Sequence, residues 1–476
     1  MQYTQKQQAA IGERGKNILV SAAAGSGKTS VLSERIARLV EQGADIKNML
    51  VCTFTNLAAG EMKERIYRRL MELAEQKEDP RLYAQAERAL QADICTIHKF
   101  AISVIQQNLL LTDLKTNVRI AVGKEVDILK AQAMEQALEE LCERQEEGVS
   151  QLYAKYCKKD DRPIVQMAMQ IYNFIMSKEH PLEWLEQAQQ LSPQTQEEYF
   201  GAYRSHVVQI LYRAKGDFEQ SLALSSKKGY DAQRQIDEAH LALTEGWLEL
   251  ARQGEFDALK SQLGSAKFRP IARGIPEEAD KKKLSGWKSD AKKQVDSLQN
   301  LMTEQELLEQ IKGDYEEVKG DICGLTSIIH GFHEAFQKLK REKNIIDYDD
   351  MLHIAYQILS SGEGNFDVAK SYQQKYDYIF VDEYQDTNGI QEAILQAISR
   401  GNNMFMVGDM KQSIYKFRLA DPSIFLGKAK QYGTGEGQSK LINMNENFRC
   451  SKSVVDFING LMGKVMSPQV GEISYG

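Results

Sequence analysis

The sequence predicts an α/β fold in which a parallel sheet is interrupted by a large, mostly helical insertion. Two observations lead to this expectation. In residues 1–111 and again from residue 346, short apolar runs alternate with helical patterns, which is typical of a parallel, doubly wound sheet. Residues 112–345 are instead rich in Gln, Glu, Lys, Leu and Ala, with apolar residues at helical spacing.

Three strand–helix pairs are expected in the first α/β part. Each strand is a short apolar run, as expected for strands buried on both faces of a sheet. The expected strands are Asn17–Ser21, Met49–Phe54 and Ile94–Ile97. The helices that follow them are expected from Lys28 to about Glu41, from about Ala58 to Leu73, and after His98.

The α/β pattern returns after residue 345. Strands are expected at Tyr378–Val381, Asn403–Val407 and Lys440–Met444, and a helix from Ser451 to Met462. We therefore expect residues 1–111 and 346–439 to form one sheet domain, and residues 112–345 to be a helical domain inserted into it. Residues 440–476 are expected to begin a second sheet domain.

The start of the insertion shows the helical pattern well. One face of the expected helix carries Leu129, Ala133, Met134, Ala137, Leu138 and Leu141. Apolar residues three or four positions apart lie on the same side of a helix, so this face is expected to be buried.

Composition limits the classes of protein that the chain can be. Of the 476 residues, 42% are hydrophobic and 27% are charged, the balance of a globular protein. The six cysteines form no Cys-x-x-Cys pair, which argues against a zinc site or a disulfide framework and fits a cytoplasmic protein. No run of about 18 apolar residues occurs, so neither a membrane span nor a membrane partner is expected.

A phosphate-binding loop is predicted between the first strand and its helix. The loop reads Ala22-Ala23-Ala24-Gly25-Ser26-Gly27-Lys28-Thr29. Its glycines allow a tight turn in which backbone N–H groups point inward, Lys28 can reach the β- and γ-phosphates, and Thr29 can bind Mg²⁺. A chance turn of this composition is the alternative, but the strand before it and the helix after it favour the functional interpretation.

Such a loop needs an acidic partner site. Asp382 and Glu383 end an apolar strand, where a carboxylate can hold Mg²⁺ and its neighbour can orient or deprotonate the attacking water. Acidic pairs also occur at ordinary solvated strand ends. Together with the phosphate loop, however, the pair predicts an ATP site.

Several further segments resemble the motifs of UvrD/Rep-like superfamily 1 helicases. In chain order, they are Tyr3–Gln7, the phosphate loop, Thr53–Met62, Thr96–Phe100, Asp382–Thr387, Val407–Arg418 and Asn447–Arg449. Within this family, the chain most resembles the AddA subunits of bacterial AddAB helicase–nucleases. That likeness lies in the phosphate loop, in Thr53–Asn56, in Thr96–Ala121 and in Asp347–Leu352.

The resemblance implies a fold and a set of nucleotide contacts. The sheet domain would be the RecA-like domain called 1A in this family, the insertion would be domain 1B, and a second RecA-like domain, 2A, would follow. Gln7 would contact the adenine edge and Phe448 would stack on the adenine. Gln412 would sense the γ-phosphate, and Arg449 would stabilise its charge in the transition state.

The resemblance also implies a site for single-stranded DNA. Phe54, His98, Tyr415 and Phe417 would offer rings to unstacked bases, while Asn56 and Arg418 would bind the backbone. Any one aromatic residue, taken alone, is more often part of a core. Two positions depart from the family pattern, because Phe417 stands where many relatives have Trp and Ser30 where several have Arg.

A basic stretch in the insertion has two interpretations. Residues 267–293 hold nine Lys and Arg side chains around Trp287. A solvated loop and helix face explains them most simply, and a contact with the phosphates of duplex DNA is the alternative. Because the net charge is −7, any DNA contact has to be made by a local cluster of this kind.

The leading hypothesis is an ATP- and Mg²⁺-dependent 3′→5′ DNA translocase, part of a helicase–nuclease that repairs double-strand breaks. The partners that the resemblance implies are single-stranded DNA, duplex DNA and an AddB-like subunit. A stand-alone UvrD/Rep-like repair helicase and a non-motor, ATP-gated interaction module are the alternatives. No later helicase or nuclease motif is present, so this chain alone is expected to hydrolyse ATP poorly and not to unwind DNA.

Overall fold

The computed structural model describes residues 3–189, 193–298, 301, 304–362, 367–434 and 437–466. The last ten residues of the expected segment 440–476 lie outside these ranges. The chain divides into two compact units. The first comprises Met1–Gln145, Lys159–Leu185 and Ser327–Gly476, and the second comprises Glu146–Lys158 and Glu186–Thr326. The second unit is therefore narrower than the expected insertion of residues 112–345.

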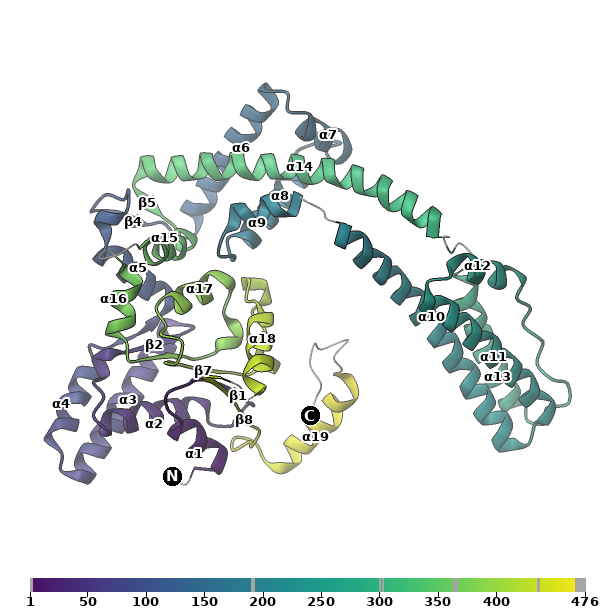
Figure 1. The fold of residues 1–476 in the computed structure, drawn as a ribbon, viewed down its shortest axis with the longest axis horizontal. Helices are drawn as coiled ribbons and strands as arrows, with labels where there is room; N and C mark the ends of the chain where they lie inside the picture. Colours follow the sequence, from purple (N-terminus) through teal and green to yellow (C-terminus); the bar gives the residue numbers. More distant parts are fainter. Residues whose placement is uncertain are drawn as a thin grey trace. The chain divides into compact units, whose positions relative to one another are not determined.

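A six-stranded parallel sheet forms the centre of the first unit (Figure 1). Its strands lie in the order β3-β2-β6-β7-β1-β8, and every neighbouring pair is parallel. The strands are β1 (Asn17–Ala22), β2 (Met49–Thr53), β3 (Asp93–Thr96), β6 (Tyr378–Val381), β7 (Met404–Gly408) and β8 (Ser439–Met444). The structure thus confirms the expected α/β class.

Helices cover both faces of this sheet, as Figure 1 shows. One layer contains α1 (Gln5–Gly12), α2 (Lys28–Glu41), α3 (Asn56–Lys77) and α4 (Pro80–Ala89). The other contains α5 (Ile97–Gln107), α15 (Tyr348–Ser360), α16 (Val368–Lys375), α17 (Gly389–Ala397) and α18 (Pro422–Gly433). Successive strand residues alternate between the two cores: Val51 packs in the first, while Leu50 and Cys52 pack in the second.

The structure corrects one expected boundary. The strand expected at Lys440–Met444 does not open a second sheet, because β8 pairs in parallel with β1, with Leu441 opposite Leu19. Ile442 and Met444 are buried in the same core as the phosphate-loop strand. Without β8, β1 would be an edge strand with an unpaired side. The strand β8 therefore belongs to the first sheet, and it is followed by α19 (Lys452–Val465), the helix expected at Ser451–Met462.

A two-stranded sheet joins the two ends of the helical segment. β4 (Arg119–Ile120) pairs in parallel with β5 (Ile345–Ile346). The sequence does not predict this pairing, because two-residue strands carry no periodicity. It brings together positions close to the expected boundaries at residues 112 and 345.

The helices between β4 and β5 belong partly to each unit. The first unit contains α6 (Lys124–Glu143) and α8 (Arg162–Ile175), and the predicted apolar face of α6 is buried. The helices α9 (Pro181–Gln189) and α14 (Glu304–Lys343) contribute residues to both units. No described helix is both long and apolar enough to cross a bilayer.

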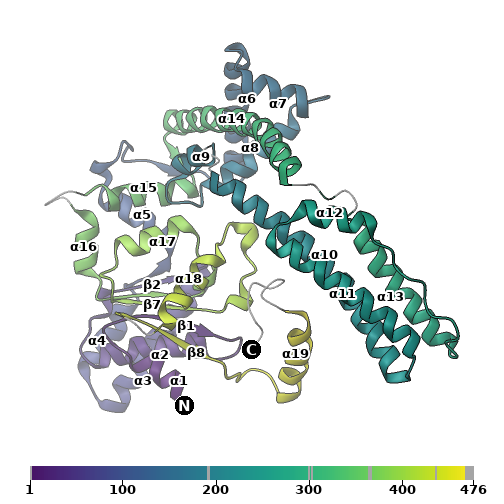
Figure 2. The same cartoon turned by 45° about the vertical axis from the view of Figure 1, so that its right-hand side comes forward.

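The second unit is a helical bundle with its own core. It contains α7 (Glu147–Tyr156), α10 (Pro193–Lys228), α11 (Asp231–Gln253), α12 (Phe256–Ser265) and α13 (Glu278–Asp296). The helices α11 and α13 run along α10 (Figure 2). Phe218, Trp247 and Phe256 are buried between the helices. Most of the basic stretch lies on α13, whose Lys281, Lys282 and Lys283 are exposed.

A buried ion cluster fixes the end of α14 against the start of α15. Lys340 Nζ lies 3.1 Å from Asp347 Oδ2 and 2.7 Å from the carboxylate of Asp350. These three side chains are only 3%, 8% and 6% exposed. Asp347 and Asp350 also form a capping box at the start of α15, so the cluster orders both helices.

Removing the buried cation should strongly destabilise the fold. Replacing Lys340 by Met (K340M) leaves two buried carboxylates without their partner, which typically costs about 3–5 kcal/mol. The free energy of unfolding should be measured by urea titration, with Lys338→Met, an exposed position on the same helix, as the control. Equal unfolding midpoints for the two variants would contradict the assigned role.

Candidate functional site

The carboxyl ends of six parallel strands meet along one edge of the sheet. Ligands bind at this edge in open α/β sheets, because the loops that follow the strands converge there. The predicted motif residues follow these strands: the phosphate loop follows β1, Phe54 follows β2, His98 follows β3, Asp382 and Glu383 follow β6, Asp409 follows β7, and Asn447–Arg449 follow β8. The topology therefore gathers segments from both ends of the chain.

The phosphate loop has the backbone of an anion cradle. Gly25 and Gly27 adopt positive φ angles of 74° and 83°, where a side chain would be strained. Gly27 is the N-cap of α2, so that no side chain covers the first N–H groups of that helix. Among the described residues, buried Ser26 Oγ finds no hydrogen-bond partner. These features fit a bound phosphate group.

Lys28 and Glu383 form an ion pair across the site. Lys28 Nζ lies 2.9 Å from Glu383 Oε2, and the two side chains are 11% and 37% exposed. Glu383 itself has a positive φ of 50°, which turns the chain sharply after β6. The structure thus joins the two predicted halves of the site through their central charged groups.

Asp382 lies deeper than Glu383. Burial, together with the nearby charge of Glu383, raises the pKa of Asp382 to about 6. A bound divalent cation would offset the free-energy cost of the buried, charged Asp382 carboxylate. Oxygen ligands such as Asp382 and Thr29 suit Mg²⁺. No described group of three or more His, Cys, Asp or Glu side chains could hold a metal. Mg²⁺ is commonly held by one or two carboxylates together with substrate phosphates and water, so it does not need a cage made only of protein groups.

Gln7 lies behind the loop and is 6% exposed. Its Nε2 donates to the Ser26 carbonyl at 3.0 Å, and its Oε1 accepts from Thr4 N at 3.0 Å. A Cβ on Gly27 would lie 3.2 Å from Gln7 Nε2. The structure therefore shows Gln7 bracing the phosphate loop, and its expected contact with adenine stays a prediction.

The segment Asn447–Arg449 lies directly on the phosphate loop. Asn447 Nδ2 donates to the Ala24 carbonyl at 2.8 Å, and Phe448 N donates to the Gly25 carbonyl at 2.9 Å. Asn447 Oδ1 also accepts from the backbone N–H of Arg449. Phe448 is 61% exposed beside the loop. The sequence analysis gave roles to Phe448 and Arg449 but named Asn447 only as a member of the motif, and it did not predict that Asn447 links Arg449 to the loop.

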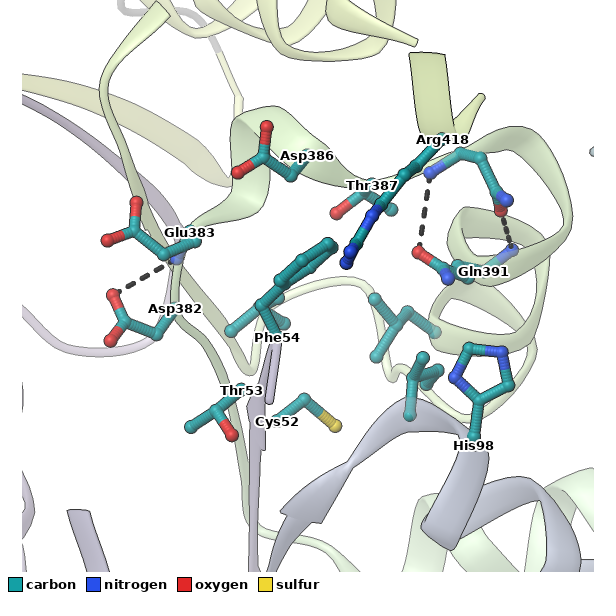
Figure 3. Close-up of a pocket in the computed structure, with 14 residues that line it drawn as sticks. Cys52, Thr53, Phe54, His98, Asp382, Glu383, Asp386, Thr387, Gln391 and Arg418 are labelled. Carbon is teal, nitrogen blue, oxygen red and sulfur yellow. Dashed lines mark hydrogen bonds between the residues drawn. The ribbon is translucent and has the colours of Figure 1, made fainter. Parts of the chain in front are cut away.

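A pocket of about 240 Å³ adjoins the acidic pair (Figure 3). Its lining residues include Phe54, His98, Glu383, Asp386 and Arg418. Figure 3 shows Arg418 extending toward the ring of Phe54. Burial and the charge of Glu383 raise the pKa of Asp386 to about 6, and Asp386 Oδ1 has no hydrogen-bond partner among the described residues. Asp386 was not among the residues predicted from the sequence.

The predicted aromatic residues gather beside this pocket. The rings of Phe54 and Tyr415 stack with centroids 4.8 Å apart, and the ring centroid of Phe417 lies 5.8 Å from that of Tyr415. The guanidinium of Arg418 lies 5.2 Å from the Tyr415 centroid. Phe417 is 76% exposed, so its ring is available to a ligand rather than part of the core.

The remaining predicted residues lie at the same edge. His98 packs edge-on against Tyr348, and burial lowers the pKa of its ring. Asn56 is exposed at the first turn of α3. Gln412 Nε2 donates to Asp409 Oδ2 at 2.7 Å. Tyr348 was missed as a partner of His98, because only the fold brings α15 next to α5.

Comparison with known proteins identifies the family of this chain. The UvrD/REP helicase N-terminal domain family matches residues 3–433. The chain is 36% identical to the A subunit of the ATP-dependent helicase/nuclease of Syntrophomonas wolfei and 34% identical to that of Alkaliphilus metalliredigens. Each alignment covers 99% of this chain but only 39% and 40% of the relative. The chain thus spans about two fifths of these relatives, and it belongs to the UvrD/REP helicase family.

Proposed function

We propose that this chain is the ATP-binding part of a 3′→5′ DNA translocase subunit in an AddAB-like helicase–nuclease. The observation that carries the proposal is the Lys28–Glu383 pair, which joins a phosphate loop to an acidic strand end beside an aromatic pocket. A nucleotide site and a slot for unstacked bases then share one edge of one sheet. That juxtaposition is what a DNA-dependent ATPase needs.

The chain's own residues divide the work at the nucleotide. Thr29 and Asp382 would hold Mg²⁺, while the loop's N–H groups and Lys28 would hold the β- and γ-phosphates of ATP. When bound, Mg²⁺ would neutralise negative charge on the phosphates, and ATP would supply the phosphoanhydride bond that is hydrolysed. Glu383 would orient the attacking water and accept its proton, and Arg449 would stabilise charge on the γ-phosphate.

The Lys28–Glu383 contact gives this site an order of events. Bound phosphates would compete with Glu383 for the Lys28 ammonium group, which now donates to Glu383 Oε2. Once Lys28 turns to the phosphates, the Glu383 carboxylate is released to face the water. The ion pair with Lys28 would therefore occupy the Glu383 carboxylate until the phosphates bind.

The aromatic pocket would grip single-stranded DNA without reading its sequence. Phe54, Tyr415 and Phe417 offer ring faces to bases, and Arg418 and Asn56 offer donors to phosphates. Two conformations with different grip, selected by binding and hydrolysis of ATP, would then move the strand stepwise.

The relatives' name supports the proposed setting. It describes both helicase and nuclease activity and a subunit of a larger assembly. We therefore infer an AddB-like partner, a role in double-strand-break repair, and work in the cytoplasm, where bacterial DNA lies. In this scheme residues 1–111 and 346–444 belong to domain 1A, and the helical segment between them belongs to domain 1B.

The helical unit offers a candidate contact for duplex DNA. Lys267, Lys288 and Lys292 line a pocket of about 720 Å³, which is also lined by Asp296 and by Lys260, whose ammonium pairs with Glu306. The three lysines of the basic stretch around this pocket would attract phosphates independently of sequence. This cluster favours the duplex-contact interpretation of the basic stretch over a purely solvated face.

Glu383→Gln tests the nucleotide site in the complete protein. Loss of the base should lower ATP turnover by about 10²–10⁴-fold while ATP binding is retained. Turnover should be measured with and without single-stranded DNA, with exposed Glu61→Gln as the matched control. If single-stranded DNA leaves the turnover of the unaltered protein unchanged, the motor proposal fails and the ATP-gated module is favoured.

Tyr415→Ala tests the aromatic slot. Losing one stacking ring should weaken binding of single-stranded DNA by about 1–3 kcal/mol, since base–aromatic stacking contributes that amount. ATP turnover without DNA should stay near its original value. Tyr83→Ala, an exposed site on α4, makes the same chemical change away from the slot. Equal DNA affinities in a fluorescence anisotropy titration would refute the slot.

The double variant Lys288→Gln/Lys292→Gln tests the duplex contact. Losing two phosphate contacts should reduce the slope of log K against log salt for duplex DNA by about two. The control, Lys282→Gln/Lys283→Gln, makes the same charge change on α13 outside the pocket. Identical slopes for both double variants would contradict the duplex contact and favour the interpretation of the basic stretch as a solvated face.

A further inference from the structure

The side-chain amide of Gln385 connects three parts of the site. Its Nε2 donates to Glu383 Oε2 at 2.8 Å and to Asp386 Oδ2 at 3.1 Å, and its Oε1 accepts from Asp409 N at 2.9 Å. Gln385 is 1% exposed, so water does not compete for these bonds. One neutral amide thus touches the proposed base, a pocket residue and the end of β7.

The surrounding backbone holds this amide in one orientation. A Cβ on Gly408 would lie 2.5 Å from Gln385 Oε1 and 3.1 Å from Gln385 N, so only glycine leaves room for it. Ser413 Oγ donates to the Gln385 carbonyl at 3.5 Å. The loop after β7 therefore contacts both the side chain and the main chain of Gln385. A movement of this loop would displace Gln385, and a movement of Gln385 would displace the loop.

Hydrogen bonds lead from this amide toward both proposed ligands. On the nucleotide side, Glu383 accepts from Gln385 as well as from Lys28. Through Asp409, the path continues to Gln412, which donates to the Asp409 carboxylate. On the other side lies Asp386, which lines the aromatic pocket with Phe54 and Arg418 (Figure 3).

The amide is suited to hold Glu383 when Lys28 turns away. Two donors point to Glu383 Oε2, and the charged one is expected to leave for the phosphates. Gln385 then still orients the carboxylate, and as a neutral group it does so with less loss of basicity than a cation would cause. The position of Glu383 would then depend on Asp386 and on the loop after β7.

We propose that Gln385 is a positioning residue through which DNA in the aromatic pocket stimulates ATP hydrolysis. This inference rests on the proposed function. DNA that contacts Arg418, Tyr415 or Asp386 shifts the loop after β7 and the Asp386 carboxylate, the amide follows, and Glu383 is aligned for the water. Gln385 itself touches neither ligand.

Gln385→Met is the first test, in the complete protein. Methionine matches the length of glutamine but cannot form the three bonds. The ratio of ATP turnover with saturating single-stranded DNA to turnover without it should fall about tenfold, within the 5–150-fold range of typical couplings. KM for ATP and the Kd for single-stranded DNA should change little. Gln396→Met, exposed on α17, is the matched control.

The melting temperature of Gln385→Met guards against a folding defect. A second variant, Gln385→Leu, also lacks the donors to Glu383 and Asp386 and adds no charge beside them, so it should lose the stimulation as well. Asp386→Asn completes a double-mutant cycle with Gln385→Met, and the two losses should be non-additive if both lie on one path. A purely structural role would lower the melting temperature and the DNA-free turnover without changing the ratio.

The outcomes separate the two proposals. If the unaltered protein is stimulated by DNA and the Gln385 variants are stimulated equally, the inference is overturned and the proposed function stands. If the variants lose DNA affinity in parallel with stimulation, Gln385 belongs to the DNA site and the coupling role is overturned. If the unaltered protein is not stimulated, the proposed function is overturned, and the inference falls with it.

Discussion

The parallel pairing of β1, β7 and β6 is the constraint on which the rest of the site depends. It brings Lys28 and Glu383, 355 positions apart in the chain, to within a hydrogen bond. Because β7 lies between β1 and β6, it ends between the strand that leads into the phosphate loop and the strand that leads into the acidic pair. Gly408 ends β7 there, and its missing side chain is the space that Gln385 occupies.

The long helical insertion adds little to the entropic cost of folding the sheet. Loop-closure entropy rises only with the logarithm of length, so a large insertion adds little cost beyond a short one. The β4–β5 pair joins its two ends, and the buried Lys340 cluster anchors its last helix to α15. The second unit buries apolar residues of its own helices in a separate core.

Much of the fold follows from the sequence, because buried parallel strands are continuous apolar runs and the functional loops begin where those runs end. That relation located the phosphate loop and the acidic pair Asp382 and Glu383, whereas the aromatic set came from the resemblance to helicase motifs. It failed for β8, since an apolar run does not say which sheet it joins. It assigned no role to Asn447, Gln385 or Asp386, which were named only as members of motifs, because their roles lie in contacts between the loops of separate strands and not in residue type.

Several central groups of the site are engaged by other protein groups. Lys28 holds Glu383, Gln7 holds the Ser26 carbonyl, Gln412 holds Asp409, and Phe54 stacks on Tyr415. A ligand must therefore exchange partners and cannot simply fill space, so part of its binding energy goes into breaking these contacts. Because several of the contacts share residues, an exchange at one position changes the neighbouring contact. A ligand can shift a protein between two conformations only as far as its affinities for those conformations differ. Contacts that share a residue provide such a difference, because a ligand that replaces one contact also changes the next.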